Sequence, residues 1–131
     1  MLSRKSKDVF IVDDDPAICK ALARVFAAAG YETQTFISAQ ELLDRHVKCP
    51  DGCLLLDVHM PGMDGPTLHQ HLQSLEWKMP VIYITGREFR GGRARARTLG
   101  ALDLLFKPID VEALVSAVES ALTPEEREEE A

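Results

Sequence analysis

The sequence predicts a single α/β domain in which helices cover both faces of a parallel β-sheet. Short apolar runs alternate five times with stretches of helical periodicity, which is the pattern of such a sheet. The 131 residues, of which 46% are hydrophobic, suffice for one core but not for two ordinary domains. We expect the domain over residues 8–122, between an N-terminal lead (1–7) and an acidic tail or the start of a linker (123–131).

Five apolar runs are expected to form the strands, because each is short and is followed by a stretch of helical periodicity. These runs are Asp8–Val12, Glu32–Phe36, Cys53–Leu56, Val81–Ile84 and Leu102–Phe106.

The first two helices have recognisable starts. Asp15 followed by Pro16 is an N-cap and first-turn pair, and Gly30 ends the helix. Ser38 and Glu41 have the spacing of a capping box, which begins a second helix. The side chains expected to face the core are Ile18, Leu22, Val25, Phe26 and Ala29 in the first helix and Leu42 and Leu43 in the second.

The third and last helices are predicted from apolar stripes, and the fourth is expected to be weak. The stripes are Leu68, Leu72 and Leu75 in the third helix and Val111, Leu114, Val115, Val118 and Leu122 in the last. The fourth helix, within Arg90–Gly100, contains Gly91 and Gly92, and each interior glycine costs about 1 kcal/mol relative to alanine. We therefore expect this helix to be the least stable one.

Composition excludes several classes of protein. The net charge is −6, although glutamates near the C-terminus contribute much of it, and a nucleic-acid-binding body is usually basic. Neither a signal peptide nor a transmembrane segment is recognisable, so we expect a cytoplasmic protein. The three cysteines fit buried thiols in a reducing compartment, and a zinc site from His46, Cys49 and Cys53 is the weaker alternative because it lacks a fourth ligand.

Three carboxylates are expected at the carboxyl ends of two strands. Asp13 and Asp14 follow the first strand, and Asp57 follows the third. Ligand sites of open parallel sheets lie at this edge, so the three side chains converge if these strands are neighbours. Their mutual repulsion would raise the pKa of at least one carboxyl or demand a cation. Mg²⁺ fits because it accepts a few carboxylate oxygens and leaves positions for phosphate oxygens.

Two more polar residues, Thr85 and Lys107, follow the fourth and fifth strands. With Mg²⁺ they would orient a phosphoryl group arriving at an aspartate nucleophile. Each residue alone has a simpler interpretation, since Asp13 or Asp14 could cap a helix and Lys107 could be solvated. Asp15 is interpreted as an N-cap rather than a ligand. The joint pattern, with each residue type at the end of a separate strand, favours a functional site.

These residues resemble the receiver domains of bacterial response regulators over about residues 8–122. The resemblance lies in Ile11-Val12-Asp13-Asp14-Asp15, in Leu55-Leu56-Asp57-Val58-His59-Met60-Pro61-Gly62-Met63-Asp64-Gly65, in Ile84-Thr85-Gly86 and in Phe106-Lys107-Pro108. It implies a flavodoxin-like fold with five helices and a parallel sheet in the strand order 2-1-3-4-5. It also implies a cis peptide bond between Lys107 and Pro108.

The resemblance also implies a role for each site residue. Asp57 would be the phosphoacceptor, with a sensor histidine kinase as donor, and Asp13 and Asp14 would form the acidic Mg²⁺ pocket. Thr85 would be the switch hydroxyl and Lys107 the lysine that senses the phosphoryl group. The roles implied for the remaining residues are a metal-ligating backbone carbonyl for His59 and rate tuning by the side chains of His59 and Arg87. His69 and His71 are expected to be solvated.

Two features concern how phosphorylation would be read out. Many receivers have an aromatic switch residue three positions before the lysine, where this chain has Leu104. Arg90, Arg93 and Arg97 would share a face of the fourth helix, which is either solvated or a homodimer surface. The acidic partners considered for such a surface are Asp103, Asp110 and Glu119. DNA contact is expected only through an output domain that this chain lacks.

The leading hypothesis is therefore a phosphorylatable signalling switch that controls transcription and turns over no separate substrate. One alternative is a degenerate receiver that acts as a phosphorylation-independent interaction module, suggested by Leu104 and the glycine-containing fourth helix. Another is a phosphohydrolase with an aspartyl-phosphate intermediate, for which Asp13 and Asp15 have the required spacing. The short chain and the motif around Asp57 argue against the phosphohydrolase.

Overall fold

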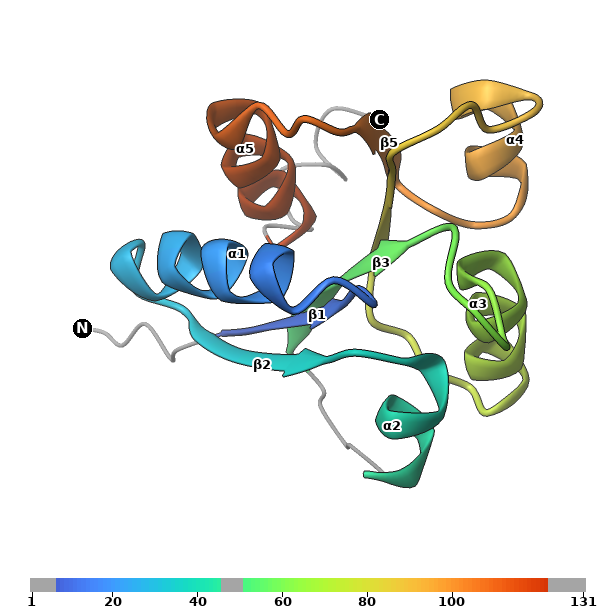
Figure 1. Ribbon diagram of the computed structural model, residues 1–131, viewed down its shortest axis with the longest axis horizontal. Coiled ribbons are helices and arrows are strands. Elements are labelled where there is room, and N and C mark those ends of the chain that lie inside the picture. The colour runs from blue at the N-terminus through green and yellow to red at the C-terminus, as the bar shows by residue number, and fades with distance from the viewer. Residues whose placement is uncertain (1–6, 46–50, 123–131) are drawn as a thin grey trace.

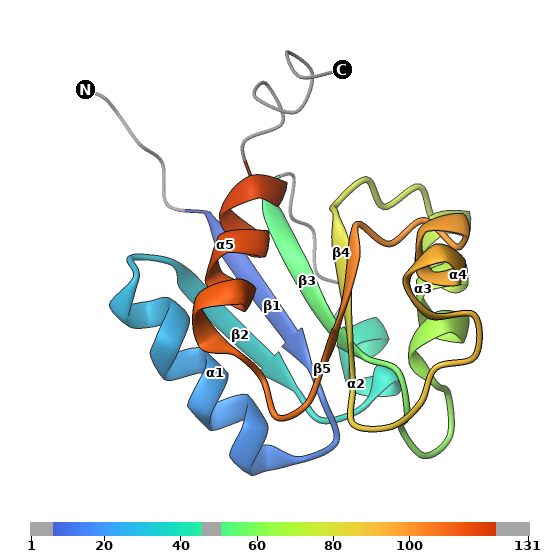
Figure 2. The ribbon, with the colours of Figure 1, turned by 90° about the horizontal axis from the view of Figure 1, so that it is seen from above.

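The computed structural model describes residues 7–45 and 51–122 as one parallel sheet between two layers of helices (Figures 1 and 2). The five strands lie in the order β2-β1-β3-β4-β5, as expected. The strands are β1 (Asp8–Val12), β2 (Glu32–Phe36), β3 (Gly52–Asp57), β4 (Val81–Thr85) and β5 (Asp103–Phe106). The helices are α1 (Pro16–Ala28), α2 (Ala39–Asp44), α3 (Gly65–Ser74), α4 (Gly92–Thr98) and α5 (Val111–Ala121).

Helices cover both faces of the sheet, so its central strands are buried on both sides (Figure 2). Helices α1 and α5 pack on one face, where Phe26 and Leu114 contact Ile11 and the other side chains of one apolar cluster. Helices α2, α3 and α4 pack on the other face, where Leu68 and Leu104 belong to the second cluster. Successive residues of β1, β3 and β4 therefore enter opposite clusters.

Side-chain caps begin four of the five helices in the described residues. Asp15 caps α1, Ser38 caps α2, Asp64 caps α3 and Asp110 caps α5, each by accepting a hydrogen bond from a backbone N–H of the first turn. The predicted capping box is present in a modified form, because Glu41 Oε1 accepts from the N–H of Ile37 rather than from that of Ser38.

Helix α4 is the exception, and the predicted helix within Arg90–Gly100 is shorter than expected. Gly91 precedes it with a φ of 88°, and the helix begins only at Gly92. The prediction that Arg90, Arg93 and Arg97 share a helical face was therefore wrong for Arg90, which lies before the helix.

Some residues at the ends of elements were predicted to be buried and are exposed. Leu75 caps the C-terminus of α3 and is 55% exposed, and Val111 is the first residue of α5 and is 45% exposed. Leu102 precedes β5 instead of belonging to it, and Ala29 is an exposed C-cap. Side chains at these ends project beyond the surface that the element buries.

The prediction of a solvated His69 was also wrong, because this side chain is buried and its Nδ1 lies 2.7 Å from the hydroxyl of Tyr83. His71 is exposed, as expected. His46, Cys49 and the acidic tail lie outside the described residues. No helix in the described part of the chain is long and apolar enough to cross a membrane.

Candidate functional site

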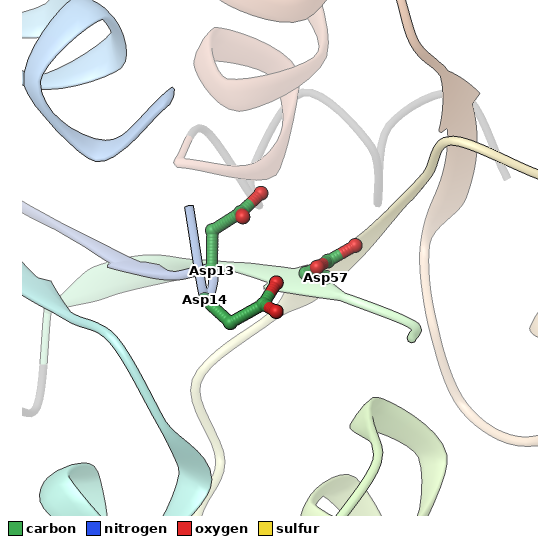
Figure 3. Close-up of side chains that lie close together, drawn as sticks. All are labelled: Asp13, Asp14 and Asp57. Atoms are coloured by element: carbon green, nitrogen blue, oxygen red, sulfur yellow. The ribbon is translucent and has the colours of Figure 1, made fainter. Parts of the chain in front are cut away.

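Three carboxylates meet at the carboxyl edge of the sheet (Figure 3). Asp57 ends β3 and Asp13 follows β1, and the two strands are paired so that Val12 lies opposite Leu56. One carboxylate oxygen from each of Asp13, Asp14 and Asp57 lies within 4.8 Å of the others. The convergence expected from the sequence is therefore present.

The cluster concentrates negative charge in a poorly solvated place. Asp13 and Asp57 are 2% and 3% exposed, whereas Asp14 is exposed. Burial first, and then the charge of Asp13, raise the pKa of Asp57 to about 7, against a smaller opposite effect of Lys107. Hard divalent cations prefer oxygen ligands of this kind, so the donor set fits Mg²⁺.

Lys107 connects two of these carboxylates. Its Nζ lies 2.9 Å from Asp13 Oδ2 and 3.6 Å from Asp57 Oδ1. Burial alone would lower the pKa of Lys107, but the hydrogen bond and charge of Asp13, together with Asp57, outweigh burial and raise this pKa. The ammonium is therefore charged, and it lies where it would also contact a group attached to Asp57. The Lys107–Pro108 peptide bond is cis, as the resemblance implied.

Thr85 is fully buried at the end of β4, and its hydroxyl interacts with the loop that follows. Thr85 Oγ1 donates to the carbonyl oxygen of Arg87 at 2.8 Å and accepts from the N–H of Arg87 at 3.2 Å. The N–H of Lys107 donates to the carbonyl oxygen of Thr85 at 2.8 Å. The two predicted residues are thus held beside each other by the pairing of β4 with β5.

Backbone contacts hold the acidic loop in place. The N–H of Asp15 donates to Asp13 Oδ1 at 2.9 Å, and Asp15 Oδ1 accepts from the N–H of Ala17, which confirms the N-cap interpretation. Cys19 in α1 donates its thiol to the carbonyl oxygen of Asp13 at 3.3 Å. Sequence reasoning missed this contact, since nothing in the periodicity of α1 distinguishes Cys19 from its apolar neighbours.

Gly65 is a second residue whose role the sequence did not reveal. A Cβ at this position would lie 2.4 Å from the carbonyl oxygen of Asp57, so only glycine lets α3 begin this close to β3. The N–H of Gly65 donates to the carbonyl oxygen of Val58 at 2.9 Å. The sequence feature that could have indicated this role is the position of Gly65 at the end of the Met63-Asp64-Gly65 run.

The remaining predicted residues lie around the site or away from it. His59 is half-buried, and no hydrogen-bond partner reaches its Nε2 among the residues that the structure describes. Arg87 is exposed beyond Thr85. Leu104 is fully buried opposite Tyr83, and Arg93 Nε lies 3.2 Å from Asp103 Oδ1 at the surface.

Comparisons with known proteins agree with this fold and site. Residues 9–119 match the family described as response regulator receiver domain. The chain is 33% identical over 128 residues to the response regulator protein TodT of Pseudomonas putida, covering 96% of this chain and 56% of TodT. It is 36% identical over 118 residues to the transcriptional regulatory protein FixJ of Azorhizobium caulinodans, covering 90% and 56% of the two chains. The chain thus spans about half the length of these curated relatives.

A solved structure shows the same architecture. The crystal structure titled FixJ-N superimposes with a TM-score of 0.80 at 30% identity, covering 90% of this chain and 94% of that one. The fold and the clustered acidic residues define a flavodoxin-like signalling domain of the two-component class. The chain belongs to the response regulator receiver domain family.

Proposed function

We propose that this chain takes a phosphoryl group on Asp57 from the phosphohistidine of a sensor histidine kinase, in the cytoplasm and in a Mg²⁺-dependent reaction. A carboxylate oxygen of Asp57 forms a bond to phosphorus while the phosphorus–nitrogen bond of the donor breaks, and the histidine ring keeps the electron pair. The observation that carries the proposal is the clustering of Asp13, Asp14 and Asp57 with the Lys107 ammonium within 3.6 Å of Asp57.

The other residues of the site would bind the metal ion, contact the phosphoryl group and control its hydrolysis. Asp13, Asp14 and Asp57, with the backbone carbonyl of His59, would hold Mg²⁺, which when bound neutralises charge on the phosphoryl oxygens. Lys107 pairs with one phosphoryl oxygen, and Thr85 donates its hydroxyl to another. The exposed or half-buried side chains of His59 and Arg87 tune how readily water hydrolyses the acyl phosphate.

Output is proposed to pass through the face formed by α4, β5 and α5. One curated relative is named a transcriptional regulatory protein, which supports control of transcription through an output domain or partner, with any DNA contact made there. Arg93 and Arg97 are exposed on α4, with Arg90 just before it, and this surface suits a homodimer. The domain catalyses its own phosphorylation and dephosphorylation and turns over no separate substrate.

Labelling with acetyl phosphate tests the phosphoacceptor. We expect Mg²⁺-dependent labelling that disappears in Asp57→Asn and in EDTA. Asp15→Asn is the matched control, because it removes a neighbouring carboxylate but retains an N-cap side chain, and it should label normally. Labelling that survives Asp57→Asn would exclude Asp57 as the acceptor.

Labelling, partner binding and phosphatase assays together separate the alternatives. A degenerate receiver would take no label and would bind its partner equally well with or without acetyl phosphate. A phosphohydrolase would release phosphate catalytically from small phosphomonoesters, whereas the proposed switch should release none.

A further inference from the structure

A column of side chains joins β4, the loop after it, and helices α3 and α4. Tyr83 lies two residues before Thr85 in β4 and is fully buried. Its hydroxyl lies 2.7 Å from Nδ1 of His69 in α3. Phe89 packs edge-on against Tyr83 with ring centroids 5.9 Å apart, and the Arg95 guanidinium lies 4.7 Å over the Phe89 ring. We call His69, Tyr83, Phe89 and Arg95 the Tyr83 column.

Gln73 fixes the orientation of His69 in this column. The amide nitrogen of Gln73 donates to the carbonyl oxygen of Leu99 at 3.0 Å and lies 3.2 Å from Nε2 of His69. An amide nitrogen only donates, so Nε2 of His69 accepts, and Nδ1 carries the proton and donates to the Tyr83 hydroxyl. Burial lowers the pKa of His69, in agreement with a neutral ring.

These contacts hold α4 at both ends. His69 and Gln73 are one turn apart on α3. Gln73 bonds to Leu99 at the C-cap of α4, and His69 reaches Phe89, before α4, only through Tyr83. Within the described part of the chain, Ala96 is the one α4 residue that is fully buried. The position of this seven-residue helix therefore depends on contacts with other elements. These are with β5, where Arg93 pairs with Asp103, and with α3 and the Tyr83 column.

The loop between β4 and α4 is attached at two points. Thr85 holds it through the backbone of Arg87, and the Tyr83 column holds it through Phe89. A Thr85 hydroxyl that turns toward a phosphoryl group on Asp57 gives up its bond to Arg87. The contact of Phe89 with Tyr83 then still attaches the loop, while the side chain of Leu104, opposite Tyr83, has no polar atom with which to respond.

We propose that the Tyr83 column transmits phosphorylation of Asp57 to α4, with Phe89 moving against Tyr83 when Thr85 releases Arg87. This inference rests on the proposed function, because it requires a phosphoryl group at Asp57. It assigns the readout to residues of β4, α3 and the loop, in place of a side chain at position 104.

Amide NMR with beryllofluoride and Mg²⁺, a stable substitute for the phosphoryl group, tests the column. In the unaltered protein, we expect shifts both near the site, at Gly86 and Arg87, and in α4. In Tyr83→Phe and Phe89→Leu, the shifts near the site should remain, whereas those in α4 should fall by at least half. Tyr31→Phe is the matched control, since Tyr31 packs on Phe26 on the other face of the sheet. This variant should change neither the shifts near the site nor those in α4.

The outcomes separate the two proposals. If α4 shifts fully in both Tyr83→Phe and Phe89→Leu, or fails to shift in the unaltered protein while the site responds, the column does not transmit the signal. If the site itself fails to respond, the proposed function is wrong. Should Phe89→Leu not fold, Tyr83→Phe decides alone, because it removes one hydroxyl and keeps the ring. A purely structural role would lower the unfolding free energy without changing the ratio of α4 shifts to site shifts.

Discussion

The ammonium of Lys107 lies 2.9 Å from Oδ2 of Asp13, so the buried acidic cluster already contains one cation of its own. The same ammonium reaches Asp57 at 3.6 Å, while Asp14 completes the group of carboxylates. One positive charge does not neutralise three negative ones. The site is therefore suited to a further cation, and Lys107 competes with it for Asp13 and Asp57.

Replacing Lys107 should tighten the binding of Mg²⁺. In Lys107→Ala, the divalent ion no longer competes with an ammonium, and we expect the dissociation constant of Mg²⁺ to fall about tenfold, or ~1.4 kcal/mol. Titration followed by amide NMR measures this constant. Lys78→Ala is the control, because Lys78 is exposed and precedes β4, at the opposite edge of the sheet. Equal or weaker binding in Lys107→Ala would contradict the competition.

The raised pKa of Asp57 predicts how metal-free stability depends on pH. Because this pKa rises from 3.8 to about 7 on folding, the folded protein keeps the proton to higher pH than the unfolded chain does. The contribution of Asp57 is fully present below pH 3.8 and is lost as the pH rises through about 7. The unfolding free energy in EDTA, measured with urea, should therefore fall between these pH values.

Asp57→Asn isolates this effect, since all other titrating groups remain. The variant should be more stable than the unaltered protein at pH 8, by about 2 kcal/mol, and the difference should shrink toward pH 4. Mg²⁺ should stabilise the unaltered protein more at pH 8 than at pH 5, because protons and the metal compete for the same carboxylate. Parallel pH profiles of the two proteins would show that Asp57 titrates normally.

Gly65→Ala should damage both stability and phosphorylation. Its Cβ would lie 2.4 Å from the carbonyl oxygen of Asp57 and 3.0 Å from Cα of Val58, so backbone must move, at a cost of about 2–3 kcal/mol. The labelling rate should fall with the displacement of Asp57. Gly30→Ala is the control, since Gly30 has a φ of +97° but no atom within 4 Å of the added Cβ. It should cost about 1 kcal/mol by urea unfolding and leave labelling unchanged.

The strands and the acidic cluster could be predicted from the sequence because both depend on which residues follow one another along the chain. Asp13 and Asp57 come directly after apolar runs, and parallel strands bring such positions to one edge. The contacts of His69 depend instead on Tyr83, a residue of another element, so periodicity within the third helix could not reveal them.

The ends of elements were predicted less well for a related reason. The glycines at 91 and 92 indicated a weak fourth helix, but their positive φ angles, which delay the helix past Arg90, depend on the loop that precedes it. Leu75 fits the spacing of the apolar stripe yet lies where α3 has already ended. The spacing of apolar residues identifies the buried face of a helix, whereas tertiary contacts determine the residue at which the helix ends.

Leu104 is fully buried and lies opposite Tyr83 in the register of β4 and β5. An aromatic side chain at position 104 would need space that the second cluster already fills with Tyr83 and Phe89. We expect Leu104→Tyr to lower the unfolding free energy in urea by about 1–3 kcal/mol, whereas the volume-conserving Leu104→Met should cost less than about 1.5 kcal/mol. If Leu104→Tyr is as stable as Leu104→Met, the cluster has room for a ring at this position. A loss of stability confined to Leu104→Tyr would mean that Tyr83 and Phe89 occupy the space that a ring on β5 would require.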